Sequence, residues 1–482
     1  MRFIKNNYLL LIIILISAFL RLYHIGFRDF WYDEAVTGVE IRESWAHMMD
    51  IIQADVHPPL YFFLVKVWSM FGNYSVIAIR SFSAFWGILG VVGVYLFTKE
   101  VAHKRAGLFA SLIIAISPFA IQYSQEARMY AMHAALIVFA AYFVVRAAKH
   151  LRVQDHIVWG IFLGLAILTH YMGIAYFLIF PIMYFVGIFV YHGKQFVFQK
   201  FWYLAKHALL GVSISLAVCI PFIRVFMNQI SMSSTSIGWI PSAYVHDIGL
   251  AFQAFIVGTA PGQISVPHVQ HIWGIDDRIV LVFCVICVVV IFGVLIRKYK
   301  FKSILLLLPC LGFILIVFVG SLLGHSFFIS RYLISASYFL YAIFGVWITT
   351  YSKIKMPYAI VAVYTILLLS IVPSEQPHGF NDLDKETRYN VNDFYTLNPV
   401  DYVVAKYYFG FDRVYLYSVD NPTFNPVSWV GVNGTIKRIE KIDDIINNGR
   451  AMILSNTDHP TSFDENKFVR RGQYDNIIIF ET

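Results

Sequence analysis

Long apolar runs alternate with short polar segments along most of the chain, which is the pattern of a helical membrane protein. Eleven of these runs are apolar enough for us to predict transmembrane helices. They lie at residues 8–22, 80–98, 106–121, 129–147, 156–169, 171–190, 205–223, 279–296, 303–323, 331–351 and 357–373. A further apolar run, residues 58–71, is shorter and carries Lys66. We therefore predict that it lies as a helix at the membrane surface.

Two long segments between the predicted spans, residues 23–79 and 227–278, form external loops in this prediction. In the first loop, apolar residues recur at three- and four-residue steps between Ile41 and Ile52. This spacing predicts an amphipathic helix that lies on the membrane or, equally well, packs against the helical bundle. The second loop is rich in Ser, Gly, Pro and His, and loops of its length are usually functional or disordered.

The composition changes after residue 373, where Asp, Asn and Arg replace Leu and Phe. Short apolar runs at 414–417, 451–454 and 477–480 predict strands, and residues 442–446 predict a helical turn. We therefore predict two domains. The first is a polytopic transmembrane domain over residues 1–373. The second is a small extracytoplasmic α/β domain over residues 374–482.

The composition supports an integral membrane protein, because 59% of the 482 residues are hydrophobic and only 14% are charged. If the N-terminus is cytoplasmic, most Lys and Arg of the membrane region fall in cytoplasmic loops, as the positive-inside rule requires. One more span after residue 58 would invert every later loop and destroy this agreement. The net charge of +8 therefore reports topology and not nucleic-acid binding. We predict a multi-pass protein of the cytoplasmic membrane.

Cysteine and histidine positions give no diagnostic metal or redox motif. All four cysteines lie in apolar runs, and Cys284 and Cys287 have C-x-x-C spacing without a polar context, so we predict no zinc, redox or disulfide role. His57, His325 and the pair His268 and His271 allow a metal site but lack a diagnostic spacing. The sequence leaves a divalent metal open and predicts no certain cofactor.

Charged residues and histidines from distant parts of the chain gather at the predicted outer ends of the helices. They are Asp33, Glu34, His57, Arg80, Glu126, Arg128, His170, Arg224, His325 and Arg331. Acids and bases at one membrane face indicate a polar reaction on an anionic, membrane-embedded ligand, and a lipid phosphate fits. Arg80 and Arg331 are the best phosphate candidates, because both open predicted helices on the face where basic residues are scarce.

Each of these residues also has a simpler interpretation. Asp33 and Glu34 would suit an ordinary helix start, where acids favour the helix dipole and Asp is a good cap. Any one of the arginines would suit an interfacial anchor. His170 connects two closely spaced spans, so a local hydrogen bond is a better prediction for it than a metal.

Four motifs together carry a family resemblance. They are Trp31-Tyr32-Asp33-Glu34-Ala35, His57-Pro58-Pro59-Leu60-Tyr61, Arg80-Ser81-Phe82-Ser83-Ala84 and Tyr123-Ser124-Gln125-Glu126-Ala127-Arg128-Met129-Tyr130. The set resembles the GT-C glycosyltransferases. It is most similar to the bacterial family-39-like branch, which is related to protein O-mannosyltransferases and to the lipid A aminoarabinose transferase. The resemblance is strong over residues 8–150. Residues 151–373 are similar mainly in hydropathy and in Ser330-Arg331-Tyr332.

The resemblance implies a GT-C fold and transfer of a sugar from a polyprenyl-phosphate carrier to a lipid, glycan or protein acceptor at the outer membrane face. It implies that Asp33 is the general base and that Glu126 is a second acid, and we add Glu34 to the catalytic candidates. The predicted substrate-binding residues are His57, Arg80, Arg128, Tyr130, Arg331 and Tyr332. The chemistry agrees, because an acceptor hydroxyl needs a base and a departing phosphate needs cations.

Two other function classes remain open. A transporter or flippase of a lipid-linked anionic substrate would also have polar groups among its helices, although transporters usually place their sites near the bilayer midplane and often show repeated halves. Here the charges cluster at one face, and the sequence shows no repeat. A non-catalytic partner subunit is the third class, and it would tolerate the loss of Asp33.

Overall fold

A computed structural model describes most of the first 350 residues and separate segments of the remainder. The described residues are 2–236, 240–259, 276–350, 362, 365–366, 393–396, 399–409, 414–417, 438–439, 451–456, 469–474 and 477–481. The chain forms two compact units. The first, here called the helical unit, comprises Met1–Tyr23, His57–Tyr61 and Ser81–Val372. The second, here called the mixed unit, comprises His24–Val56, Phe62–Arg80 and Pro373–Thr482.

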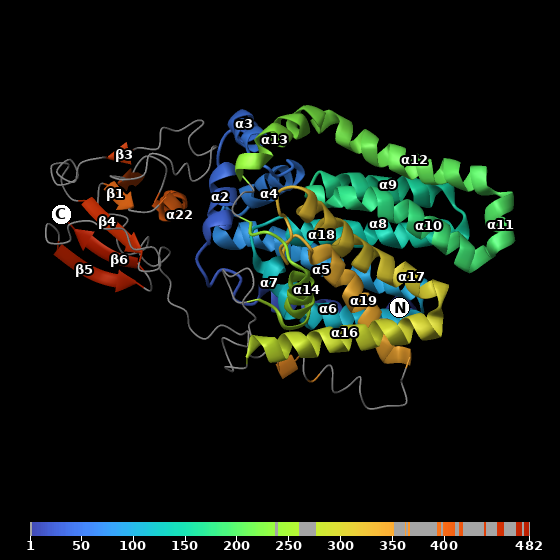
Figure 1. Ribbon diagram of the computed structural model, residues 1–482. Coiled ribbons are helices and arrows are strands. Elements are labelled where there is room, and N and C mark those ends of the chain that lie inside the picture. Colours follow the sequence, from blue (N-terminus) through green and yellow to red (C-terminus); the bar gives the residue numbers. More distant parts are fainter. Residues whose placement is uncertain are drawn as a thin grey trace. The chain divides into compact units, whose positions relative to one another are not determined.

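The helical unit is built from the apolar runs (Figure 1). Its helices are α1 (Arg2–Leu22), α5 (Val76–Val101, which begins in the mixed unit), α6 (Lys104–Ile116), α7 (Pro118–Gln125), α8 (Tyr130–His150), α9 (Val153–Ile167), α10 (Tyr176–His192), α11 (Lys194–Gln199), α12 (Phe201–Cys219), α13 (Ile223–Ser236), α14 (Val245–Val257), α16 (Asp277–Tyr299), α17 (Phe301–Leu307), α18 (Phe313–Leu323) and α19 (Ile334–Thr350). Single turns lie at η1 (Tyr171–Ala175), η2 (Ile220–Phe222) and η3 (Leu308–Gly312).

These helices cover ten of the eleven predicted spans, and most of the eleventh, 357–373, lies outside the described residues. Within the described part, six helices are long and apolar enough to cross a membrane, or up to seven if α6 and α7 form one span. These two helices bend by 57° where Pro118 follows Ser117, whose hydroxyl accepts the Ala120 N–H and so begins a new helix. The chain is therefore a multi-pass helical membrane protein, and the count of eleven stays a prediction.

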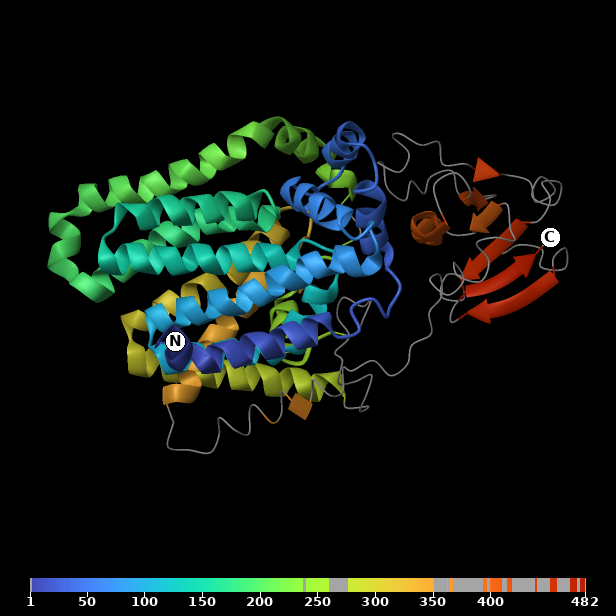
Figure 2. The same cartoon turned by 180° about the vertical axis from the view of Figure 1, so that it is seen from behind.

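Close helix packing and apolar outer surfaces both fit a membrane environment. Helices α8, α9 and α10 lie side by side in both views (Figures 1 and 2). Helix α9 approaches α12 so closely that a Cβ on Gly160 would lie 2.5 Å from the Gly211 carbonyl oxygen. Small residues permit such contacts where the surrounding lipid supplies no hydrophobic force between helices. On α1, Leu15 and Phe19 are 68% and 63% exposed, as lipid-facing residues are.

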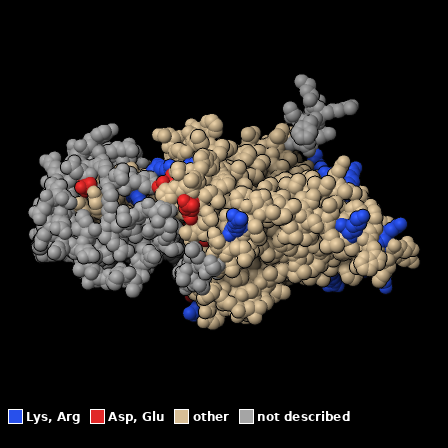
Figure 3. Space-filling view, turned by 90° about the horizontal axis from the view of Figure 1, so that it is seen from above, with Lys and Arg blue, Asp and Glu red and all other residues tan. Residues whose placement is uncertain are grey.

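Basic residues mark one end of the helical unit. Figure 3 shows Lys and Arg spheres toward the right, where Figure 1 places α11 and the junction of α16 with α17. The last turn of α16 contains Arg297 and Lys298, and α11 begins with Lys194. All three belong to loops that the sequence predicts to be cytoplasmic. The structure thus brings the predicted cytoplasmic charges to a common end of the bundle.

The mixed unit combines helices from the first loop with strands from the end of the chain. Its helices are α2 (Tyr32–Glu40), α3 (Trp45–Ala54), α4 (Leu60–Met70, which begins in the helical unit) and α22 (Pro399–Phe409). Its strands are β1 (Asp393–Thr396), β2 (Val414–Tyr417), β3 (Arg438–Ile439), β4 (Ala451–Asn456), β5 (Val469–Tyr474) and β6 (Ile477–Glu481). The strand order is β3-β2-β1-β4-β6-β5. The first four strands are parallel, and β6 runs antiparallel to β4 and β5.

Local predictions in this unit agree with the elements that form. Strands β2, β4 and β6 occur at the three predicted positions, whereas residues 442–446 lie outside the described residues. Helix α4 coincides with the short apolar run, and α3 covers most of the amphipathic stretch. Met48 and Ile52 on α3 are fully buried, which supports packing inside the protein for that face of the helix. The domain boundary at residue 373 stays a prediction.

Candidate active site

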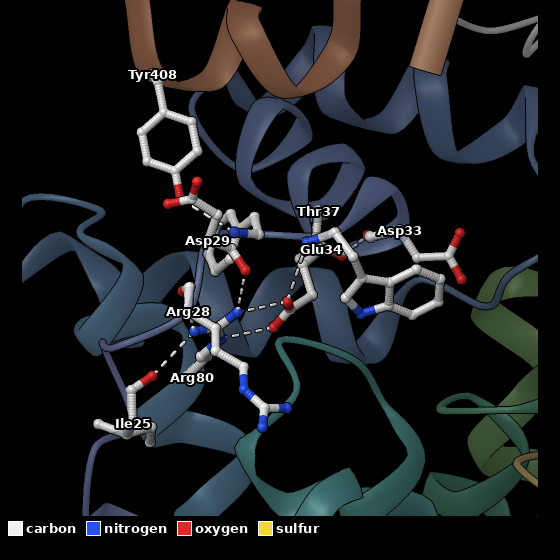
Figure 4. Close-up of polar contacts among 10 residues, drawn as sticks. Ile25, Arg28, Asp29, Asp33, Glu34, Thr37, Arg80 and Tyr408 are labelled. Carbon is white, nitrogen blue, oxygen red and sulfur yellow. Dashed lines mark hydrogen bonds and ion pairs between the residues drawn. The ribbon is translucent and has the colours of Figure 1, made fainter. Parts of the chain in front are cut away.

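Arg80 ties the loop before α2 to the start of that helix (Figure 4). Its Nε and Nη2 donate to the Glu34 carboxylate oxygens at 2.8 and 2.6 Å. Nη1 donates to the carbonyl oxygens of Ile25 and Arg28 at 3.0 and 2.7 Å, and Nη2 donates to that of Asp29 at 2.9 Å. A guanidinium has five N–H donors, so all of them are used here. This arrangement favours a structural role for Arg80 over the predicted phosphate contact.

Glu34 is the carboxylate partner of Arg80 in this ion pair. It is 1% exposed, and its carboxylate also accepts the Trp31 N–H at 3.4 Å. Trp31 is the N-cap residue of α2, so Asp33 and Glu34 both lie in the first turn and neither is the cap. The simpler interpretation, a helix start, is therefore correct for their location. The ion pair with Arg80 makes Glu34 a positioning residue in this structure.

Asp33 has a different orientation from its neighbour. It is half-buried, and Figure 4 shows its carboxylate pointing away from Arg80 and Glu34. The side chain of Arg28 also lies outside the network of dashed bonds in that view. Burial, and then the nearby Arg80 cation, lower the pKa of the Arg28 guanidinium, while Glu34 opposes the shift. Asp33 and Arg28 therefore lie beside the Arg80–Glu34 ion pair without belonging to it.

Helix α22, from the C-terminal part of the chain, packs on α2. The Tyr408 hydroxyl accepts the Phe30 N–H at 3.0 Å, immediately before α2. Arg42 donates to the Tyr407 carbonyl oxygen at 2.6 Å and lies 4.0 Å from the ring of that tyrosine. A Cβ on Gly38 would lie 2.6 Å from the same ring, so only glycine allows this approach. The C-terminal segment thus helps to hold the helix that bears Asp33.

The buried Arg80–Glu34 pair predicts a large stability effect. Arg80→Met should lower the free energy of unfolding by about 3–5 kcal/mol, because it leaves a buried carboxylate without its cation. Arg80→Lys should have a smaller effect, since it keeps the charge but offers three donors. Chemical denaturation of the purified protein in detergent measures both, with exposed Arg278→Met as the control. Unchanged stability of Arg80→Met would contradict the structural role.

His57 and Arg128 form the first part of a second cluster, which lies in the helical unit. The His57 carbonyl oxygen accepts from the Gln229 amide at 2.9 Å, and the Tyr171 hydroxyl donates to the same glutamine. Arg128, in the turn between α7 and α8, is 2% exposed and has its Nη2 3.1 Å from His57 Nε2. The Ser83 hydroxyl donates to the Arg128 carbonyl oxygen at 3.0 Å. The bonds to the two carbonyl oxygens hold the backbone at His57 and at Arg128, and so they position both side chains.

His170 lies next to this pair and carries a neutral ring. Its Nδ1 accepts the Met172 N–H at 3.2 Å, which confirms the predicted local hydrogen bond and leaves the ring proton on Nε2. That nitrogen is buried without a hydrogen-bond partner among the described residues. Burial, and then the positive fields of neighbouring histidines and arginines, lower the pKa of His170 well below its usual value. The surroundings of His170 are therefore electropositive, and its ring offers a donor.

Arg331 and two tyrosines complete the cluster. Arg331 is 8% exposed and lies in the turn before α19, whereas the predicted span 331–351 makes it the first residue of the helix. Its Cζ is 6.0 Å from the centroid of the Tyr332 ring. The Tyr332 ring lies 4.9 Å from that of His170 and 6.3 Å from that of Tyr130. Five of the predicted substrate-binding residues, His57, Arg128, Tyr130, Arg331 and Tyr332, thus converge from three segments of the chain around His170, which belongs to a fourth.

Three other predicted site residues, Glu126, Arg224 and His325, lie outside this group of side chains, and one neighbour of His170 was not identified from the sequence. Glu126 is half-buried at the C-cap of α7, and its carbonyl oxygen accepts the Arg128 N–H at 2.8 Å. Arg224 and His325 are exposed.

His133, whose ring is 5.5 Å from that of His170, was not predicted, although it follows Tyr130 by three residues on α8. That spacing places both on one helix face and was the available signal.

No metal centre is evident in the described residues, where no group of three or more His, Cys, Asp or Glu side chains is arranged to hold an ion. His268 and His271 lie outside the described residues. The chemistry that this arrangement supports is general-base catalysis by a carboxylate and anion binding by guanidinium, imidazole and hydroxyl groups.

Comparisons with known proteins give one family and one fold. Residues 56–224 match the family model described as dolichyl-phosphate-mannose-protein mannosyltransferase. No curated protein matches the chain. ArnT from Cupriavidus metallidurans, solved bound to undecaprenyl phosphate, aligns over 98% of both chains with 11% identity and a TM-score of 0.63. The same protein in its apo state aligns over 99% of this chain and 98% of its own, with 11% identity and a TM-score of 0.66.

The two findings agree with each other and with the motifs. The family match includes His57, Arg80 and Arg128, and the fold match extends over nearly the whole chain. Residues 56–224 thus carry the sequence signature of the dolichyl-phosphate-mannose-protein mannosyltransferases on an ArnT-like fold, which confirms the resemblance to GT-C glycosyltransferases.

Proposed function

We propose that this membrane glycosyltransferase moves a sugar from a polyprenyl-phosphate carrier to an acceptor at the outer face of the cytoplasmic membrane. The enzyme class and the lipid-phosphate donor follow from the family match together with the ArnT-like fold. The acceptor is a cell-envelope lipid, a glycan or a protein. The sugar carbon is inverted, with Asp33 as the general base.

The observation that carries the proposal is a group of side chains in the helical unit, called the cationic cluster below. Its members are His57, Arg128, Tyr130, His170, Arg331 and Tyr332. Two buried guanidiniums, Arg128 and Arg331, lie around the neutral imidazole of His170, whose Nε2–H has no acceptor among the described residues. Guanidinium groups bind two phosphate oxygens at once, and an N–H donor adds a third contact. Tyr332, beside His170, supplies a hydroxyl. A carrier phosphate is the ligand that this set of donors complements.

The reaction needs a base for the acceptor hydroxyl and charge stabilisation for the leaving phosphate. Asp33 takes the proton of the acceptor hydroxyl while its oxygen attacks the anomeric carbon. The bond between that carbon and the phosphate oxygen breaks, so the phosphate leaves with the electron pair and the configuration inverts. A phosphate leaving group needs cations more than protonation, and Arg128 and Arg331 provide them. Glu34 and Arg80 hold the turn that carries Asp33, and Arg28 is a further candidate cation there.

We also propose the finer topology. Eleven spans place the N-terminus in the cytoplasm and residues 374–482 outside, so that Asp33 and the cationic cluster face the same aqueous side. The first external loop, 23–79, then belongs functionally with the extracytoplasmic part of the chain. The packing of α22 on α2 within the mixed unit supports this assignment.

Cysteine labelling tests the orientation. Asn447→Cys, which lies outside the described residues, should react with a membrane-impermeant thiol reagent in intact spheroplasts. Phe198→Cys, on the 71% exposed Phe198 of α11, should react only after the membrane is opened. The wild-type protein, whose four native cysteines are buried or half-buried, gives the background labelling. The reverse labelling order would overturn the proposed topology.

A direct assay tests the function. The purified protein in nanodiscs should consume polyprenyl-phosphate sugars in the presence of an envelope-lipid, glycan or peptide acceptor, and the product should carry the inverted linkage. Mass spectrometry of envelope glycans and of polyprenyl-phosphate sugars, with and without the protein, identifies the acceptor. Movement of intact lipid-linked sugar between leaflets, without transfer, would favour a flippase instead.

A further inference from the structure

A cavity of about 370 Å³ lies next to the cationic cluster, within the helical unit. Its walls include Leu250, Gln253, Ala254, Thr259, Phe328 and Ser330. The volume falls within the range of small-molecule sites, and such sites combine apolar walls with a few placed polar groups. Ser330 immediately precedes Arg331 in the chain, so one short segment contributes both to the cavity and to the cluster.

Helix α14 is arranged so that one of its faces is available to a ligand. Gly249 and Phe252 contact α16, where a Cβ on Gly249 would lie 3.0 Å from Leu281 and the Phe252 ring lies 6.1 Å from that of Phe292. Residues three and four positions apart share a helix face, and Leu250, Gln253 and Ala254 line the cavity at that spacing. The packing against α16 therefore fixes the orientation of the face that lines the cavity.

Gln253 is the polar group that the fold leaves unexplained. It is 1% exposed, and neither its amide nitrogen nor its amide oxygen has a hydrogen-bond partner among the described residues. Burying an unsatisfied amide is costly, so such groups normally point to a bound ligand, water or a functional role. An amide both donates and accepts, which matches adjacent hydroxyl groups on one molecule.

The charges around the cavity decide against an anion in this place. Its described lining residues include no Lys or Arg, and they do include the half-buried acid Asp247, whose carboxylate lies 3.0 Å from the His246 ring nitrogen. A phosphate would be repelled there, whereas a neutral ring with hydroxyl groups would not. The apolar wall formed by Phe328 and Leu250 suits the C–H face of such a ring. The chemistry is that of a monosaccharide.

We propose that this cavity binds the sugar ring of the lipid-linked donor, with Gln253 bonding its hydroxyl groups, and that it sets which sugar is transferred. The inference rests on the proposed function, because the ring must be joined to a phosphate. In a polyprenyl-phosphate sugar the two groups are one bond apart, and the cavity and the cluster are joined through Ser330 and Arg331. A site that hydrogen-bonds a substrate hydroxyl also rejects analogues that lack it.

The test compares donor lipids with and without a sugar. Wild-type protein in nanodiscs is titrated with undecaprenyl phosphate and with undecaprenyl-phosphate glucose, mannose and galactose, with binding followed by native mass spectrometry. Gln253→Leu should weaken binding of the preferred sugar lipid by about tenfold or more, the loss of one to two hydrogen bonds, and leave undecaprenyl phosphate unaffected. Gln253→Asn, which keeps the amide on a shorter side chain, should give an intermediate loss.

A filled cavity gives a second, independent readout. Leu250→Trp places a large ring in the cavity and should also weaken only the sugar-bearing lipids. Leu216→Trp, on the half-exposed outer face of α12, is the matched control and should bind all four lipids as wild type does. Retained binding of undecaprenyl phosphate shows that a variant is folded.

The outcomes separate this inference from the proposed function. If the wild-type protein binds none of the lipids, the proposed function fails. If it binds them and Gln253→Leu binds every sugar lipid as tightly as wild type, the cavity is not the donor-sugar site. If donor binding is unchanged but the dependence of rate on acceptor concentration shifts, the cavity holds the acceptor, and the assignment to the donor is overturned.

Discussion

Asp33→Asn should abolish sugar transfer while leaving the protein folded and able to bind its donor. The amide keeps the shape of the carboxylate but cannot take the proton of the acceptor hydroxyl, and loss of a general base costs about 10²–10⁴ in rate. Asp33 is half-buried in the first turn of α2, with its carboxylate outside the Arg80–Glu34 ion pair. The substitution should therefore leave that ion pair, and with it the stability of the turn, unchanged.

The measurement is turnover of a polyprenyl-phosphate sugar by the purified variant, together with its denaturation curve. Asp50→Asn is the matched control, because Asp50 is an exposed acid on α3 in the same external loop. It should turn over donor at the wild-type rate. Near-normal turnover by Asp33→Asn would remove Asp33 from the mechanism, and loss of turnover with loss of folding would make it structural.

The helices were predictable because each depends on local sequence. Nineteen-residue apolar windows identify membrane spans without tertiary information, and α5, α8 and α12 follow the predicted runs with shifts of a few residues. The strands at Val414–Tyr417 and Ile477–Glu481 were also predictable, since short apolar runs between polar residues indicate strands. Helix ends were less exact, because capping decides them. Arg331, for example, opens the predicted span but lies before α19, which begins at Ile334.

The partners within the site were not predictable, because they depend on contacts between distant segments. Both Glu34 and Arg80 are typical of a catalytic site in the sequence, and only the structure shows them bonded to each other over 46 residues. Tyr408 meets Phe30 over 378 residues, a contact that no local pattern indicates. Gln253 gave no signal either, since an isolated glutamine in an external loop is ordinary. Gln253 becomes a candidate only in the structure, where its amide is buried without a hydrogen-bond partner among the described residues.

Arg331→Ala should reduce transfer at limiting donor by roughly ten- to hundredfold, the cost of one charge-assisted hydrogen bond to the carrier phosphate. Arg331 is 8% exposed beside Tyr332 and His170, the residues that form the cationic cluster with Arg128 and His57. An arginine in this position contributes charge and a planar pair of donors. Saturating donor should recover part of the lost rate, since binding of the carrier is what the variant weakens.

The comparison with lysine separates charge from geometry. Arg331→Lys keeps the positive charge but cannot bind two phosphate oxygens in one plane, so its loss should lie between those of wild type and alanine. Arg278→Ala, on an exposed arginine in the first turn of α16, is the control and should leave the donor dependence unchanged. If Arg331→Ala kept the wild-type dependence on polyprenyl-phosphate sugar, Arg331 would be an interfacial anchor. The carrier phosphate would then have to bind at Arg128 and His57 alone.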